Sequence, residues 1–95
     1  MSPLIVDASG LTRGVWKYVV TTTQARFVLI ETQIQHRQMI LPGEVPIHAG
    51  YLLFIDRQQW KLKDPVSESL RIYGDEETDA RVLTGILGCA PMEKF

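Results

Sequence analysis

Two histidines and a glutamate are the side chains of this 95-residue sequence best suited to acid–base chemistry. Glu44 and His48 are four residues apart around Pro46, so in an extended segment both side chains point to the same side. A histidine beside a carboxylate can move protons near neutral pH. His36, Glu44 and His48 therefore form the candidate site of a small enzyme or small-ligand binder. Solvent-exposed histidines beside a turn would give the same pattern.

Other catalytic and cofactor signatures do not occur in the sequence. There is no Cys-x-x-Cys, no His-Glu-x-x-His and no acidic calcium loop, so we expect no metal and no cofactor. Cys89, the single cysteine, follows the end of a predicted helix, where the helix dipole disfavours a thiolate. The dispersed glycines form no phosphate-binding loop. We predict no catalytic residue, and a binding protein is favoured over an enzyme.

Three lysines alternate with aromatic or apolar residues, as basic residues do in small barrels that bind single-stranded nucleic acids. They are Lys17, Lys61 and Lys63. Strand alternation would place these lysines on one face and the aromatic side chains on the other, whereas a stacking groove needs both on the same face. The net charge of −1 also argues against a general polyanion-binding surface. Single-stranded nucleic-acid binding is therefore a third hypothesis, and nucleic acid is not the expected partner.

The spacing of the apolar residues changes near Gly74 from a strand period to a helix period. Residues 4–73 contain short apolar runs at strand spacing, broken by turn signals such as Pro42-Gly43. Residues 75–88 show one amphipathic helical pattern, with Asp75 as N-cap and Gly88 just beyond the last turn. The sequence predicts one α+β domain over 1–95. It combines a mostly antiparallel, curved or partly closed sheet of five to seven short strands with a C-terminal helix packed on one face.

The longest strand candidates, 11–22 and 26–35, predict an antiparallel hairpin whose even-numbered residues face the core. Pro46 confines the segment 44–48 to an edge or a loop, and Ala49-Gly50 is a further break. The apolar run 51–55 is typical of a strand covered on both faces. The expected core consists of Trp16, Tyr18, Val20, Val28, Ile30, Leu53, Ile55, Leu62, Leu70, Ile72, Leu83 and Leu87.

The face of the hairpin away from the helix is the expected binding surface. Its residues are Arg13, Lys17, Phe27, Leu29 and Glu31. Two bulky apolar side chains among charges of both signs are typical of an interface, and Phe27 would be its anchor. The pattern also leaves open whether Met39, Leu41 and Tyr73 are buried or belong to an interface. The expected partner is another protein, and an unpaired sheet edge could also support a homodimer.

The leading hypothesis is a small non-enzymatic protein-binding domain, such as an immunity protein or an inhibitor. In size and class the chain is similar to small strand-rich, one-helix proteins encoded beside bacterial toxins or in phages. Met1-Ser2-Pro3 lacks the basic start of a signal peptide, and no apolar run reaches the roughly 20 residues of a membrane span. A lone cysteine suits a reducing compartment. We expect a bacterial, cytoplasmic protein without membrane contact.

Overall fold

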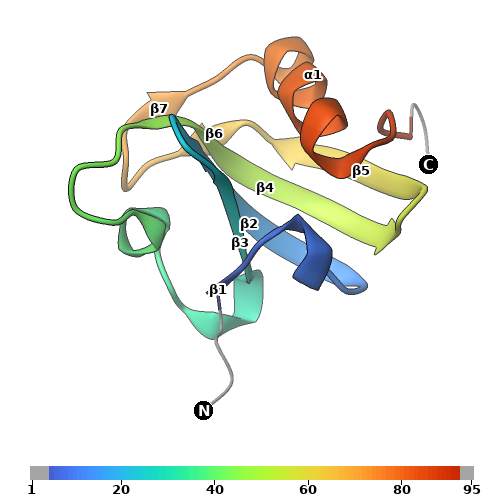
Figure 1. Cartoon of the computed structure of the whole chain (residues 1–95), viewed down its shortest axis with the longest axis horizontal. Coiled ribbons are helices and arrows are strands. Elements are labelled where there is room, and N and C mark those ends of the chain that lie inside the picture. Colours follow the sequence, from blue (N-terminus) through green and yellow to red (C-terminus); the bar gives the residue numbers. More distant parts are fainter. Residues whose placement is uncertain (1–4, 93–95) are drawn as a thin grey trace.

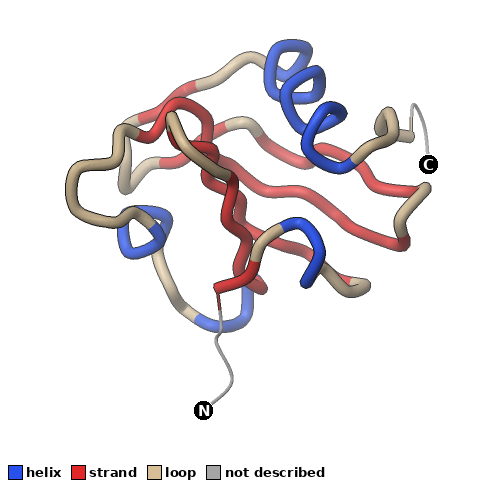
Figure 2. Tube along the Cα trace, viewed as in Figure 1, coloured by secondary structure: helices blue, strands red, loops and turns tan. Residues whose placement is uncertain are grey.

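The computed structural model describes residues 5–92 as a five-stranded antiparallel sheet, a separate two-stranded sheet and one α-helix (Figure 1). The strands are β1 (Ile5–Val6), β2 (Gly14–Thr21), β3 (Ala25–Leu29), β4 (Pro46–Asp56), β5 (Gln59–Asp64), β6 (Val66–Ser67) and β7 (Ile72–Tyr73). Short 3-10 helices η1 (Ala8–Gly10), η2 (Ile30–Thr32) and η3 (His36–Met39) lie in the connections, and α1 (Glu76–Leu87) follows β7 (Figure 2). The predicted α+β fold is confirmed.

Two hairpins build the larger sheet, whose strand order is β1-β3-β2-β4-β5. In the β2–β3 connection the Thr21 amide donates to the Gln24 carbonyl over 2.8 Å. In the β4–β5 turn the Asp56 carboxylate accepts from the Gln58 amide, a local bond that favours turns at Asp. β2 is rich in β-branched residues, which suit a pleated surface. It pairs with β3 on one side and β4 on the other.

β4 runs without a break through Ala49-Gly50, contrary to the expectation from sequence. Its first residues, Pro46–Gly50, pair with β2 alone, and β5 joins only from Tyr51 onward. Pro46 therefore lies at a local edge, as predicted. Gly50 allows the two strands to approach, because a Cβ at this position would lie 2.0 Å from the Asp64 carbonyl oxygen. The glycine marks close packing of two backbones rather than a strand end.

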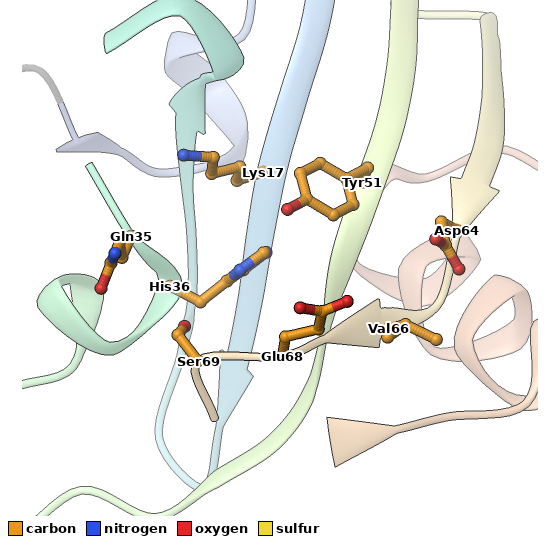
Figure 3. A pocket seen from close by; sticks show the side chains of 8 residues that line it. All are labelled: Lys17, Gln35, His36, Tyr51, Asp64, Val66, Glu68 and Ser69. Atoms are coloured by element: carbon orange, nitrogen blue, oxygen red, sulfur yellow. The ribbon is translucent and has the colours of Figure 1, made fainter. Parts of the chain in front are cut away.

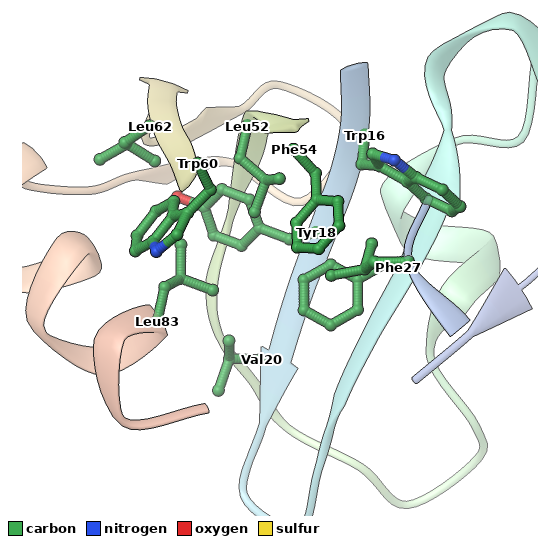
Figure 4. Packing of buried hydrophobic residues seen from close by; sticks show 10 residues of the cluster. Trp16, Tyr18, Val20, Phe27, Leu52, Phe54, Trp60, Leu62 and Leu83 are labelled. Carbon is green, nitrogen blue, oxygen red and sulfur yellow. The ribbon is translucent and has the colours of Figure 1, made fainter. Parts of the chain in front are cut away.

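α1 begins and ends where its capping residues predict. The Asp75 carboxylate accepts from the Thr78 amide over 2.9 Å, and Gly88 adopts φ 83° beyond the last turn. Leu83 of α1 is buried against one face of the sheet, in a core cluster rich in aromatic side chains (Figure 4). The buried members of this cluster are Leu11, Trp16, Tyr18, Val20, Phe27, Leu52, Phe54, Trp60, Leu62 and Leu83.

A second core cluster covers the opposite face of the sheet. Val19, Val28, Met39 and Ala49 are buried there. Partly buried residues from β1, from the segments on either side of η3 and from the β6–β7 unit pack against them; these are Ile5, Ile34, Ile40, Leu70 and Ile72. The expectation that only the helix covers the sheet is therefore wrong for this region.

Phe27 is a core residue, not a surface anchor. It pairs with Tyr18 across β2 and β3, so both side chains lie on the helix-facing side, and Phe27 is 0% exposed. The sequence pattern predicts that the even-numbered residues of both hairpin strands lie on the same face of the sheet. The observed register places even residues of β2 opposite odd residues of β3, and a one-residue difference reverses every side chain.

The predicted core is confirmed for half of its members. Trp16, Tyr18, Val20, Val28, Leu62 and Leu83 are buried. Leu53, Ile55, Leu70, Ile72 and Leu87 are partly covered. Ile30 is 44% exposed, because β3 ends at Leu29 and the chain leaves the sheet as η2 instead of continuing the strand to residue 35.

The burial of Phe27 gives a direct stability prediction. Phe27→Ala should lower the free energy of unfolding by about 3–5 kcal/mol, because it leaves a cavity in the helix-facing core cluster. Ile30→Ala, three residues along and half exposed, is the matched control and should cost less than about 1 kcal/mol. Urea unfolding measures both. Equal losses for the two variants would contradict the β3 register.

Two glycines should respond in opposite directions to alanine. Gly85 lies within α1, and an added Cβ would meet nothing within 4 Å, so Gly85→Ala should stabilise the domain by about 0.5–1 kcal/mol. Gly50→Ala should destabilise it by about 1–3 kcal/mol or more, because the new methyl group meets backbone atoms of residues 64 and 65. Thermal unfolding of both variants checks this, and a stabilised Gly50→Ala would refute the close strand approach.

Candidate functional site

The three residues predicted for acid–base chemistry belong to separate hydrogen-bond networks. His36 contacts the Gly50 carbonyl, Glu44 holds Arg26, and His48 contacts Asp79. His36 lines a pocket that neither Glu44 nor His48 lines. The structure therefore does not assemble the three into an acid–base site.

Glu44 fastens the loop before β4 to the β2–β3 hairpin. Its carboxylate accepts from both terminal nitrogens of Arg26, from the Leu41 amide at 2.8 Å and from the Thr23 hydroxyl at 3.1 Å. The hydrogen bond with the Arg26 guanidinium is the main reason why the pKa of Glu44 is lowered to about 2. These contacts use the carboxylate in a structural role.

His48 belongs to a network centred on Asp79, which is 0% exposed. The Tyr18 hydroxyl donates to Asp79 Oδ2 over 2.5 Å, and His48 Nδ1 lies 2.9 Å from Oδ1. Burial, and then the neighbouring carboxylate, raise the pKa of Tyr18, so the phenol stays protonated. Three surface pockets among residues 5–92 are lined by other side chains. The network joins α1 to β2 and β4.

His36 lies instead beside a polar pocket of 330 Å³ between η3, the sheet and the β6–β7 unit (Figure 3). Its ring meets the Tyr51 ring edge to face, with centroids 5.1 Å apart, and is 3% exposed. Nε2 is 2.8 Å from the Gly50 carbonyl and must donate to it. Burial lowers the pKa of His36 below 6.5, so the ring is neutral at pH 7. The charged groups at the pocket are Lys17, Asp64 and Glu68.

The residues of the predicted binding face do not form one surface. Lys17 and Phe27 lie on opposite faces of the sheet, and Leu29 packs beside the helix-facing core. Arg13 precedes β2 and Glu31 lies in η2, both exposed. The reversed β3 register removes the apolar centre of this face, so that expectation is corrected.

The lysines proposed to bind nucleic acid are separated from the tryptophans. Lys17 pairs with Tyr51, and Lys61 pairs with Leu53, on the face away from α1. Trp16 and Trp60 belong to the helix-facing core, and are not available for stacking with bases.

Four large apolar side chains are exposed at one end of the sheet; the sequence left Leu41 and Tyr73 open as interface residues and did not single out Val45 and Ile47. They are Leu41, Val45, Ile47 and Tyr73, exposed by 57%, 58%, 48% and 70%. We call these four residues the apolar end: Leu41 and Val45 lie in the loop before β4, Ile47 lies at the start of β4, and Tyr73 lies on β7, which packs against β4 (Figure 1). The sequence contains a signal for this exposure. The apolar residues of segment 41–47 are interspersed with the turn-forming residues Pro42, Gly43 and Pro46, which prevent the regular strand that would bury apolar side chains.

Across the described part of the chain, no three His, Cys, Asp or Glu side chains gather as metal ligands would. Between residues 5 and 92, no helix has the length and apolar character needed to cross a membrane. Comparisons with protein-family models, curated proteins and solved structures give no match to this chain. A functional proposal therefore has to come from geometry and chemistry.

The buried neutral His36 predicts a pH dependence of stability. As the pH falls through about 6.5, the unfolded chain binds a proton at His36 that the folded protein resists. The free energy of unfolding should therefore decrease from about pH 7 toward about pH 5. His36→Gln keeps a donor for the Gly50 carbonyl and should flatten this dependence. Urea unfolding across the range measures it; an unchanged slope in the variant would contradict the assignment.

Proposed function

We propose that the chain is a non-enzymatic protein-binding domain, of the inhibitor or immunity-protein kind, that docks through the apolar end. The observation that carries the proposal is the exposure of Leu41, Val45, Ile47 and Tyr73 at one end of the fold. Clustered exposed apolar side chains are typical of interaction sites. The proposed setting is the bacterial cytoplasm, where the thiol of Cys89 would stay reduced.

The apolar end is held in a fixed shape. The Glu44 contacts fasten its loop, and the Thr22 amide donates to the Val45 carbonyl over 3.2 Å. Ile47 belongs to β4, and Tyr73 pairs with Val66 in the small sheet. A rigid surface loses less conformational entropy on binding than a disordered one, which favours affinity.

The charge beside the apolar end defines the chemistry of the partner. Tyr73 leads directly into the first turn of α1, where Asp75, Glu76 and Glu77 are exposed. Arg71 adds one opposite charge. An apolar centre with a mainly acidic rim fits a protein whose own apolar patch is surrounded by lysine and arginine.

A second copy of the chain fits this surface less well. A two-fold dimer would place the acidic rims of both copies near each other, and like charges across an interface are unfavourable. The sheet edges are also poorly suited to pairing: β1 has two residues, and the Met92 amide donates to the Trp60 carbonyl of β5 over 2.7 Å. The homodimer stays a prediction that sedimentation can test.

The test combines affinity capture from the native host with matched variants. Ile47→Ser and Tyr73→Ser should each weaken binding of the captured protein by about tenfold or more, because they remove large apolar contacts. Ile30→Ser also removes an exposed isoleucine, but away from the apolar end, and should bind as the wild type does. Titration calorimetry with the purified partner measures the affinities.

Two results would overturn the proposal. One is a partner that binds Ile47→Ser and Tyr73→Ser as tightly as the wild type. The other is capture of nothing but a second copy of the chain, confirmed as a dimer by sedimentation. Weaker binding at higher salt would support the acidic rim, because exposed charges are screened.

A further inference from the structure

The edge strand β1 covers only part of β3. Its pairing with β3 ends at Val6 and Phe27, and the chain then turns into η1. The hairpin end of β3 extends beyond β1, as Figure 1 shows. Within residues 5–92, no strand residue stands opposite Ala25 on that side of the sheet.

The backbone of Ala25 faces this open edge. The Thr21 amide donates to the Gln24 carbonyl, so the backbone groups of Gln24 face β2. These groups alternate in direction along an antiparallel strand, and those of Ala25 therefore face away from β2. Ala25 presents one N–H donor and one carbonyl acceptor, the groups with which another extended segment can pair.

A pocket of 310 Å³ lies beside the open edge. Its apolar lining consists of Ile5, Val6, Ala25, Met39 and Leu41. Leu41 also belongs to the apolar end, so the two surfaces adjoin. The Arg26 guanidinium donates to the Met39 carbonyl over 3.0 Å, which places Arg26 on the η3 side of the sheet. In a segment paired with Ala25, the residues on either side of the paired one point to that same side, where the pocket lies.

One charge at the pocket is left over. The charged residues that line it are Asp7 and Arg26, and the Glu44 carboxylate neutralises Arg26. Asp7 takes part in none of the ion pairs within residues 5–92. Hydrogen bonds from the Ser9 hydroxyl and amide lower the pKa of Asp7, so its carboxylate is charged at neutral pH. The pocket therefore combines an apolar wall with a surplus negative charge, as the apolar end does.

We propose that the protein partner docks an extended segment at this edge. The segment pairs with the backbone of Ala25, inserts one large apolar side chain into the pocket and places a lysine or arginine near Asp7. This inference rests on the proposed function and names the part of the partner that is bound. The volume is near the lower end of the range for small-molecule sites, which suits one side chain. The opening beyond β1 is too short for a continuous sheet between two copies of the chain.

The probe is a blocked pentapeptide, acetyl-Lys-Val-Leu-Val-Lys-amide, whose alternation puts leucine and both lysines on one face. At about 5 mM, added to the full chain with ¹H–¹⁵N NMR detection, it should shift the amides of Val6, Ala25 and Met39 with a Kd of about 1 mM. The same peptide with serine in place of leucine should bind about tenfold more weakly. So should the peptide with N-methylated valines, which lacks the N–H groups that pair with the Ala25 carbonyl.

A matched pair of variants assigns the charge. Asp7→Asn should weaken peptide binding by about threefold, while asparagine keeps the N-cap of η1. Asp56→Asn makes the same change in the exposed β4–β5 turn, which does not line the pocket. It should leave binding unchanged. The amides outside the pocket report whether each variant is folded.

The proposal is overturned if the pentapeptide leaves these three amides unshifted, or if either modified peptide binds as tightly as the original. It is also overturned if Asp56→Asn weakens binding as much as Asp7→Asn, or if the same amides shift with chain concentration alone, which would make a second copy the occupant. Weaker capture of the partner by Ile47→Ser and Tyr73→Ser, with an unshifted pentapeptide spectrum, would refute this segment and leave the apolar end supported. The two failures are therefore distinguishable.

Discussion

The buried carboxylate of Asp79 joins the helix to the sheet, and the rest of the arrangement depends on it. Removing a carboxylate from water is costly unless its oxygens are hydrogen-bonded. Tyr18 from β2 contacts one oxygen and His48 from β4 contacts the other. Asp79 also lies near the N-terminal end of α1, where the helix dipole favours negative charge. Because the three residues come from three elements, the position of α1 across the sheet is fixed by bonds as well as by apolar packing.

This constraint has consequences for both surfaces of the domain. It holds the first turn of α1 close to the start of β4, since His48 follows Ile47 directly. The acidic residues of that turn and the exposed Tyr73 are therefore kept at the same end of the fold as Val45 and Ile47. On the other face of the sheet, the alternation of the same strands directs Lys17 and Tyr51 toward η3 and the β6–β7 unit. One sheet thus supports an apolar surface at its end and a polar pocket on its face.

The sequence predicts the features that local chemistry decides. The helix follows from the spacing of its apolar residues and from Asp75 and Gly88, and its observed bounds agree with them. The α+β class follows from the change of period near Gly74. The face of β3 could not be predicted with the same certainty, because the β2–β3 turn sets the register. A shift by one residue exchanged Phe27 and Val28 between core clusters without changing the hydrophobic pattern.

Long-range contacts account for the rest of the differences. In the sequence, Asp79 is one of several acidic residues at the start of the helix. Its burial depends on the hydrogen bond with Tyr18, which is 61 residues away. His36 was selected for its chemistry, but its neighbours in the pocket include Lys17 and Glu68 rather than Glu44 and His48. Such groupings follow from how η3 and the β6–β7 unit fold onto the sheet, which no local spacing encodes. The exposure of Val45 and Ile47 likewise depends on where the other elements pack, and local spacing does not determine that.

Hydrogen exchange of the chain with and without its captured protein partner tests the central claim most directly. Docking through the apolar end predicts slower exchange of amides in residues 41–48 and 72–77 in the complex. The amides of β2 and β5 should exchange as they do in the free chain. Protection centred on the sheet face of Lys17 and Lys61, with residues 41–48 unchanged, would contradict the account.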